Sequence, residues 1–260
     1  MDKAFLTPDQ IFSWLKNEAK FKHTGLGADY LVDVNNIKKQ IVVAFDKTST
    51  GSKLDWLINL CFMPLTIITA FVAGAAFSFF GILKPVFIIL AIIEIVLTIY
   101  VCIKWQTKTL LNMTVGKFKC HTGLALVYTS IQEKLFKEVT YLKAKTMFPI
   151  VVYGWSQGGG MAQLFAADYY LRTSEQVTVT TFGALRTAWL KSSKKVLDKA
   201  LTENSKLYEN SSDIVPKMPL KVWGFKSSKY IKHIGKKFNW LKIFNTAKYH
   251  TAYDNRELYE

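Results

Sequence analysis

The chain turns from strand to helix at Pro149-Ile150-Val151-Val152-Tyr153-Gly154-Trp155-Ser156-Gln157-Gly158. Its first five residues form a short apolar run typical of a buried strand, and helical spacing follows from Gln157 to Leu171. Between them, Gly154 and Gly158 flank Ser156 in the pattern G-x-S-x-G. In this strand–turn–helix context the pattern indicates a nucleophile elbow, a strained turn that exposes a serine hydroxyl at the edge of a sheet.

The two glycines of this turn have a steric role, because larger side chains would hold the strand and the helix apart. The backbone amide of Gln157 begins the helix, so we expect it to face the position of an oxyanion. A phosphate-binding turn is the alternative interpretation of a glycine-rich junction of this kind. The chain lacks G-x-x-x-x-G-K, which excludes a P-loop.

The segments around the elbow predict an α/β sheet, because short apolar strands alternate with helices. A hairpin is expected around Asn35-Asn36. The expected strands are Asp29–Val34, Gln40–Phe45, Pro149–Tyr153, Val177–Phe182 and Lys206–Glu209. One helix is expected to begin at Thr7, and three others are expected over Ala125–Leu135, Gln157–Leu171 and Trp189–Leu201. In the helix over Gln157–Leu171, Met161, Leu164, Phe165 and Tyr169 should face inward.

A serine nucleophile needs a histidine base and a carboxylate that orients it, and α/β-hydrolases supply these in the order Ser, Asp, His. Asp213 lies in a loop just after a predicted strand, where such an acid belongs. Two of the four histidines, His233 and His250, follow Ser156. Chain order favours His250, in a loop near the carboxyl terminus, and leaves His233 as the alternative. No Cys/His cluster has zinc spacing, and this chemistry needs no metal or organic cofactor.

A long apolar segment interrupts the α/β pattern. No charged residue occurs from Trp56 to Leu83, and Val86 to Ile103 carries only Glu94. These runs match the roughly 20 residues that cross a bilayer, and a short turn at Lys84-Pro85 joins them. We therefore predict a transmembrane helical hairpin over residues 57–103, with a re-entrant hairpin or a pair of buried core helices as alternatives. Lysines gather at its base, which places residues 1–56 and 104–260, the predicted catalytic domain, on the cytoplasmic side.

Several ordered blocks of residues 27–56 and 115–254 resemble the class 3 lipases, the family of the filamentous-fungal lipases. The matching blocks are Ile41-Val42-Val43-Ala44-Phe45 with Thr48, Asp55-Trp56-Leu57 with Asn59-Leu60, His121-Thr122-Gly123 with Tyr128, the elbow, Thr181-Phe182-Gly183-Ala184, Asp213-Ile214-Val215-Pro216, His233-Ile234-Gly235, and His250 with Tyr253.

This resemblance implies an α/β-hydrolase fold with a central, mostly parallel sheet. It also implies Ser156, Asp213 and His250 as the catalytic residues, with His233 in a structural block. The oxyanion hole would be formed by Gln157 and Thr48, although this chain has Asp46-Lys47-Thr48 where the family has R-G-[ST]. The apolar segment occupies the position of the family's lid, which would bring the mouth of the active site to the bilayer.

The chain carries a net charge of +15, which favours anionic partners. From Ile214 to Tyr249 there are nine lysines, interleaved with aromatic residues, and no acidic residue. Nucleic-acid binding and a solvated basic face are alternatives. Beside a membrane anchor, we interpret this segment as a surface for anionic phospholipids, since each lysine near such a surface gains about 1 kcal/mol.

Together these features predict a membrane-anchored serine hydrolase that cleaves lipid esters of the lipase or phospholipase A type through an acyl-enzyme. The alternatives are a membrane-perturbing or scaffold protein on an inactive hydrolase fold, and a lipid acyltransferase that uses the same triad.

Overall fold

The computed structural model describes residues 8, 10–13, 22, 29–46, 118–221, 224–235 and 246–259. Their centre is a six-stranded sheet in the order β1-β2-β3-β4-β6-β8. β1 is antiparallel to β2, and every other neighbouring pair is parallel. The strands are β1 (Tyr30–Asn35), β2 (Gln40–Phe45), β3 (Ile150–Trp155), β4 (Thr178–Phe182), β6 (Lys206–Asn210) and β8 (Ile231–Ile234).

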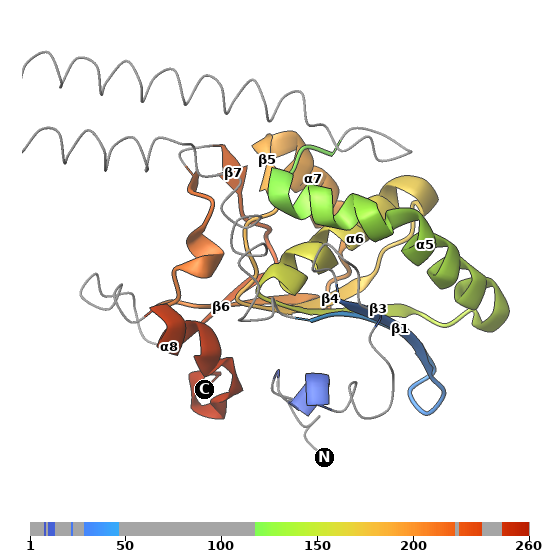
Figure 1. Cartoon of the computed structure of the whole chain (residues 1–260), viewed down its shortest axis with the longest axis horizontal. Helices are drawn as coiled ribbons and strands as arrows, with labels where there is room; N and C mark the ends of the chain where they lie inside the picture. Colours follow the sequence, from blue (N-terminus) through green and yellow to red (C-terminus); the bar gives the residue numbers. More distant parts are fainter. Residues whose placement is uncertain are drawn as a thin grey trace, which may run out of the picture.

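Three helices cover one face of this sheet, as Figure 1 shows: α5 (Thr122–Thr146), α6 (Gln157–Thr173) and α7 (Leu190–Ala200). Alternate residues of a strand point to opposite faces, so Ile41, Val43 and Phe45 of β2 pack on the helix side. Helix α6 is buried along its length from Gln157 to Tyr169, because it lies between the sheet and its two neighbouring helices. A second sheet has two short strands, β5 (Ala188–Trp189), which precedes α7 in the chain, and β7 (Phe225–Lys226), which follows it.

The opposite face carries a second core cluster, which combines the two ends of the chain. Ile11 and Phe12 pack there with Trp155 and Tyr253. The carboxyl-terminal elements α8 (Thr246–Thr251), η5 (Ala252–Asp254) and η6 (Arg256–Leu258) follow one another below the sheet in Figure 1. Both faces of the parallel part of the sheet are therefore covered, as parallel sheets require.

Most of the predicted elements are present, with shifted ends. The β1–β2 hairpin and the Lys-rich helix α7 are confirmed, and the four inward-facing residues of α6 are buried. The prediction for Ala125–Leu135 was too short, since α5 continues to Thr146. A one-turn helix η2 (Val215–Lys217) after Asp213 was not predicted.

The predicted hairpin over residues 57–103 lies outside the described residues. In the ranges that the structure describes, no helix has the length and apolarity needed to cross a membrane. Strands β2 and β3, which flank that segment in the sequence, are adjacent parallel neighbours in the sheet. Because residues 57–103 lie outside the described residues, the division into a catalytic domain of residues 1–56 and 104–260 and an inserted hairpin stays a prediction.

Candidate active site

Ser156 occupies a strained turn between β3 and α6. Its backbone has φ 56° and ψ −121°, in a region that non-glycine residues rarely adopt. The amide of Ser156 donates to the carbonyl of Phe182 at 2.9 Å, which fixes the turn to the end of β4. Strain of this kind persists only where the surrounding structure holds it, and here it directs a serine hydroxyl away from the sheet.

The neighbouring glycines permit this turn because there is no space for a side chain. A Cβ atom on Gly154 would lie 2.3 Å from the carbonyl oxygen of Gly158. A Cβ atom on Gly158 would lie 2.3 Å from the carbonyl oxygens of both Phe45 and Asp46. The start of α6 therefore lies directly against the ends of β2 and β3, as the G-x-S-x-G pattern predicts.

Three residues predicted from the sequence converge at the carboxyl ends of the strands. His250 Nε2 lies 2.8 Å from Ser156 Oγ, and His250 Nδ1 lies 2.7 Å from Asp213 Oδ2. A carboxylate only accepts hydrogen bonds, so Nδ1 of the imidazole is the donor to Asp213. In the neutral imidazole Nε2 is then the acceptor, and it receives the hydroxyl hydrogen of Ser156.

Asp213 is fully buried and hydrogen-bonded at both carboxylate oxygens. Oδ1 accepts from the amide of Val215 at 2.9 Å, and Oδ2 also accepts from the hydroxyl of Tyr253 at 2.9 Å. The same hydroxyl accepts from the amide of Asn210. Burial, and then the negative charge of Asp213, raise the pKa of Tyr253 well above its ordinary value, so this phenol remains a donor.

Gly183, at the end of β4, supplies the space in which the three side chains meet. Its φ of +58° lies in the left-handed region. A Cβ atom there would lie 2.9 Å from Tyr253, 3.0 Å from His250 and 3.1 Å from Asp213. This glycine belongs to one of the sequence blocks that resemble the class 3 lipases, and the sequence alone indicated no role for it.

The two predicted oxyanion donors differ in what the structure describes. Gln157 is buried and begins helix α6, so its amide lies at the positive end of the helix dipole beside Ser156. Asp46, the last described residue after β2, has its carbonyl oxygen against Gly158. Thr48 lies outside the described residues.

His233 lies apart from the triad. It is in strand β8 with a side chain 70% exposed, and its Nδ1 is 3.9 Å from Glu209 Oε2. Burial, and then the nearby Asp213, raise the pKa of Glu209 to about 7, against the opposing effect of Arg186 and two lysines. Nothing in the sequence pattern indicated this unusual carboxyl group.

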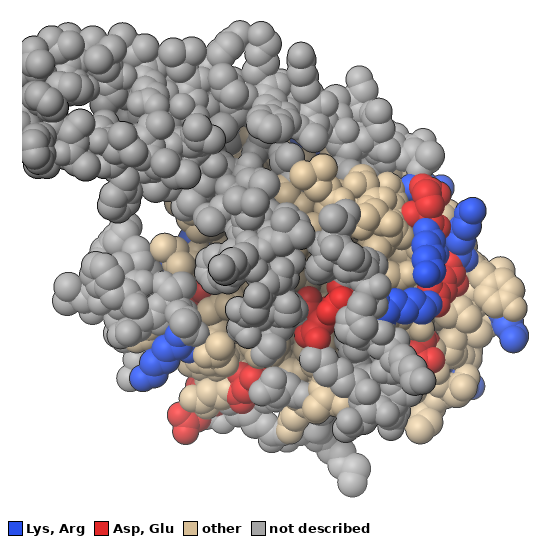
Figure 2. All heavy atoms as spheres, in the orientation of Figure 1, with Lys and Arg blue, Asp and Glu red and all other residues tan. Residues whose placement is uncertain are grey.

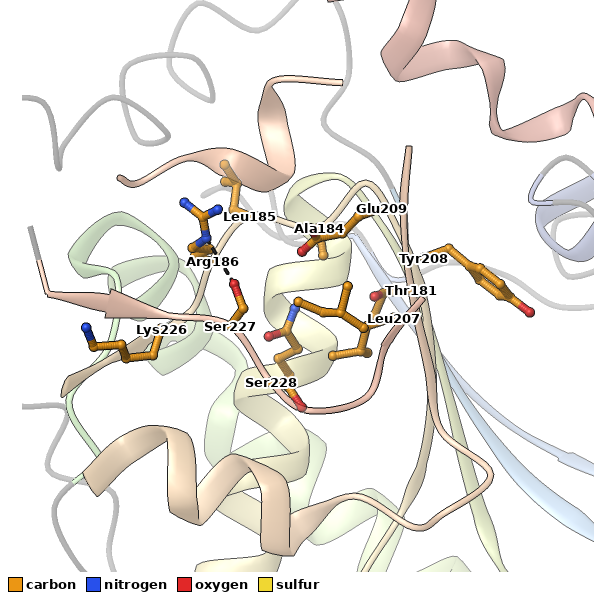
Figure 3. A pocket seen from close by; sticks show the side chains of 12 residues that line it. Thr181, Ala184, Leu185, Arg186, Leu207, Tyr208, Glu209, Lys226, Ser227 and Ser228 are labelled. Atoms are coloured by element: carbon orange, nitrogen blue, oxygen red, sulfur yellow. Dashed lines mark hydrogen bonds between the residues drawn. The ribbon is translucent and has the colours of Figure 1, made fainter. Parts of the chain in front are cut away.

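Glu209 lines a small pocket whose walls are part polar and part apolar. Figure 3 shows Arg186, Glu209 and Thr181 around it, with Tyr208 directed away from it. Its volume of about 10 Å³ is that of about one water molecule. This cavity is therefore too small to hold an acyl chain.

His121, the residue before helix α5, has a role that the sequence did not reveal. His121 is fully buried, and its Nδ1 accepts from the amide of Leu124 at 3.3 Å, so it caps the helix. Its amide donates to the carbonyl of Thr187. The H-T-G block therefore has a structural role here.

Comparison with known proteins gives a family match. The family model for lipase (class 3) matches residues 94–223, which is half of the chain. No curated protein matches the sequence.

Similar solved structures are fungal lipases. A mono- and diacylglycerol lipase from Aspergillus oryzae has 21% identity and a TM-score of 0.56, with 85% of this chain and 64% of that chain covered. The Rhizomucor miehei lipase in its propeptide complex has 18% identity and a TM-score of 0.56, with 85% and 58% covered. MDLA from Penicillium cyclopium has 14% identity and a TM-score of 0.53, with 84% and 63% covered.

At these identities the likeness concerns the fold, which is that of an α/β-hydrolase with a mostly parallel central sheet. The chain spans about three fifths of the length of these three lipases.

Proposed function

The chain belongs to the class 3 lipase family, and we propose that it is a serine hydrolase that cleaves carboxylic esters of lipids. One observation carries this proposal: Ser156, His250 and Asp213 form a continuous line of hydrogen bonds at a nucleophile elbow. Together they form the nucleophile, base and orienting acid that acyl transfer needs. Figure 1 places their elements, the α6 start, the β6 end and α8, at one edge of the sheet.

The first half-reaction follows from the hydrogen-bond directions. Ser156 Oγ attacks the ester carbonyl while His250 Nε2 takes its proton, and a tetrahedral oxyanion forms. The buried carboxylate of Asp213 stabilises the imidazolium across the 2.7 Å bond to Nδ1. His250 returns the proton to the leaving alcohol, and the acyl group remains on Ser156.

The second half-reaction repeats these steps with water. His250 takes a proton from water, which attacks the acyl-enzyme, and the fatty acid leaves as Ser156 recovers its proton. The amides of Gln157 and Thr48 are the proposed oxyanion donors in both halves. Support for Gln157 comes from its place at the start of α6.

For the substrate class, the proposal follows the activity of the similar lipases and the charge of this chain. The similar structures include a mono- and diacylglycerol lipase and a lipase, so a carboxylic ester of a lipid is the expected substrate. The basic surface of this chain favours phospholipid, or lysophospholipid, over uncharged acylglycerol.

We also propose that residues 57–103 anchor the protein in a membrane as a helical hairpin. The support is in the sequence: these residues contain two charged side chains, Lys84 and Glu94, and lysines at 47, 53, 104, 108 and 117 flank them. The flanking lysines favour a catalytic domain on the cytoplasmic side.

Helix α7 supports the proposal that the membrane partner is anionic. Lys191, Lys195 and Lys199 are exposed and recur at every fourth position, so they share one face of the helix. Among the described residues, none of these three lysines pairs with an acidic group, whereas Lys194 pairs with Asp198. Lysines and acids are interleaved instead where α5 lies, on the right of Figure 2.

A test uses the purified full-length chain in detergent micelles and in liposomes. Wild type should release fatty acid from phosphatidylcholine, phosphatidylserine or diacylglycerol, and Ser156→Ala should lower the rate by about 10⁴- to 10⁶-fold. Product analysis by mass spectrometry separates free fatty acid from a transferred acyl group. Equal rates for the two proteins would reject the proposed nucleophile. A wild type inactive on every ester would favour a scaffold on an inactive fold.

A further inference from the structure

Arg186 binds three successive carbonyl groups of the loop that follows Asp213. Its guanidinium donates from Nη1 to the carbonyls of Lys217 and Pro219, the latter at 2.9 Å, and its own amide donates to the carbonyl of Met218 at 2.9 Å. The remaining contact, from Nε to Ser227 Oγ at 3.1 Å, ties the same side chain to the strand region of β7. Figure 3 shows this bond as the dashed line at the pocket.

An unbroken path of hydrogen bonds connects this clamp to the triad acid. The amide of Val215 donates to Asp213 Oδ1, and the amide of Met218 donates to the carbonyl of Val215 at 3.0 Å. The carbonyl of Met218 then accepts from the amide of Arg186. Three hydrogen bonds thus lie between the carboxylate and the backbone amide of Arg186. The guanidinium holds the same loop at the two flanking carbonyls, those of Lys217 and Pro219.

The hydrogen bonds of the Arg186 side chain go to neutral oxygens, those of Ser227, Lys217 and Pro219, and burial lowers the pKa of its guanidinium. Among the described residues, charged groups near it are Glu209, which favours its charge, Lys217, which lies on the clamped loop, and Lys226, which lines the same pocket. Arginine suits this position because its planar group donates from two different nitrogens, Nε to Ser227 and Nη1 to the loop carbonyls, whereas all donors of a lysine lie on one nitrogen.

On the other side, Arg186 is three residues from Gly183, whose backbone lies against His250 and Asp213. The segment 183–186 therefore contacts the triad at one end and the acid loop at the other. Displacement of the loop would move Asp213 away from His250 Nδ1 without removing any catalytic group.

We propose that Arg186 is a positioning residue that holds Asp213 against His250 by clamping the loop Val215–Pro219. The role of Asp213 as orienting acid rests on the proposed function. Whether Arg186 holds Asp213 against His250 can be tested even if the protein hydrolyses no ester.

The test compares Arg186→Gln and Arg186→Lys with Arg172→Gln in the full-length chain in detergent micelles. Arg172 is the matched control, because its side chain is 7% exposed and pairs with Asp168 and Glu133 on α6 and α5, in contact with no triad residue. All variants are first checked for a cooperative unfolding transition. If Arg186→Gln does not fold, Arg186→Lys and the milder Ser227→Ala decide.

The readout is the proton on Nδ1 of His250, which the 2.7 Å hydrogen bond to Asp213 holds. It is followed as a low-field resonance by NMR of ¹⁵N-labelled histidine and assigned with His250→Asn. We expect this resonance in wild type and Arg172→Gln, a weakened one in Arg186→Lys and Ser227→Ala, and its loss in Arg186→Gln. An unchanged resonance in folded Arg186→Gln, or in folded Arg186→Lys where the glutamine variant does not fold, overturns the clamp.

Kinetics provide the second readout. With a short soluble ester, kcat should fall at least ten-fold in Arg186→Gln, while KM changes little. The loss should stay below the about 10⁴-fold that replacement of the orienting aspartate itself by asparagine causes. A wild type without esterase activity would contradict the proposed function, and the Nδ1 proton resonance of His250 would then decide alone whether the clamp exists.

Discussion

His250 Nε2 lies 2.8 Å from Ser156 Oγ, although 94 positions separate the two residues in the chain. The contact exists because both residues follow elements that end at the same edge of the sheet. Ser156 leaves β3, Asp213 follows β6, and α8 carries His250 back over that edge. Three segments that are distant in sequence thus form one site.

The two candidate bases give a direct comparison. His250→Ala should reduce kcat for ester hydrolysis about as much as Ser156→Ala, by several orders of magnitude, because its imidazole contacts Ser156, the proposed nucleophile. His233→Ala should leave kcat within about three-fold, since its exposed ring lies 3.9 Å from Glu209 and is hydrogen-bonded to neither Ser156 nor Asp213 in the described part of the chain. Initial rates with a soluble ester check this. The reverse ranking of the two variants would assign the base to His233.

A comparison of alanine variants at Gly183 and Gly235 distinguishes the effect of crowding beside Asp213 and His250 from the effect of backbone strain. Both have positive φ, at 58° and 72°, so an alanine at either position should cost about 1–2 kcal/mol of stability. Gly183→Ala places a Cβ within 3.1 Å of Tyr253, His250 and Asp213, whereas Gly235→Ala meets Asn210 and Leu258.

Urea unfolding should therefore show similar losses for the two variants. Activity at a temperature where both are folded should fall at least ten-fold in Gly183→Ala and change little in Gly235→Ala. Equal activity losses would show that crowding at the triad has no special effect.

Glu209 should make stability depend on pH. Its pKa is raised from 4.5 to about 7 in the folded chain, so the folded state disfavours the ionised form. The resulting penalty is absent below pH 4.5, grows as the pH rises towards 7, and is complete above 7. A difference of this size corresponds to about 3 kcal/mol.

Glu209→Gln removes this titration, so its free energy of unfolding relative to wild type should rise by up to about 3 kcal/mol between pH 4 and pH 8. Chemical denaturation at several pH values measures the difference. Glu203→Gln, at an exposed position, is the control and should show no such trend. A flat difference for Glu209→Gln would refute the raised pKa.

The proposed anchor predicts that two activities separate. Replacement of residues 57–103 by a Gly/Ser linker should make the protein more soluble and preserve hydrolysis of short dissolved esters, because the triad lies outside this segment. Hydrolysis of liposomal phospholipid should fall steeply, since the active site is no longer held at the surface. The ratio of these rates in the intact and linker forms is the measurement. Equal liposome rates would reduce the segment to a tether, and loss of both activities would place it in the pocket wall.

The sequence predicted the elbow and the sheet well because both follow from local rules. G-x-S-x-G between an apolar strand and a helix indicates a tight turn, and residues 41–45 and 150–155 are continuous apolar runs. The second half of α5 was missed for a physical reason. From Glu133 onward its polar residues and lysines obscure the apolar spacing, and Leu135, Val139 and Leu142 reveal the buried side only in the folded chain.

Contacts between distant segments were the other limit. The bond from Tyr253 to Asp213 and the clamp of Arg186 on residues 217–219 depend on which loops the fold brings together. No spacing rule connects position 186 with position 217. The raised pKa of Glu209 has the same origin, because strand propensity carries no information about the burial of a particular carboxyl group.

The central claim is that Ser156 is an activated nucleophile, and covalent labelling tests it most directly. The full-length protein is treated with a fluorophosphonate probe, digested and mapped by mass spectrometry, with Ser156→Ala and His250→Ala alongside. We predict one modified peptide in wild type, with the phosphonate on Ser156, greatly slowed labelling in His250→Ala and none in Ser156→Ala. A wild type that stays unlabelled at Ser156, or a His250→Ala variant that is labelled as fast as wild type, would contradict the claim.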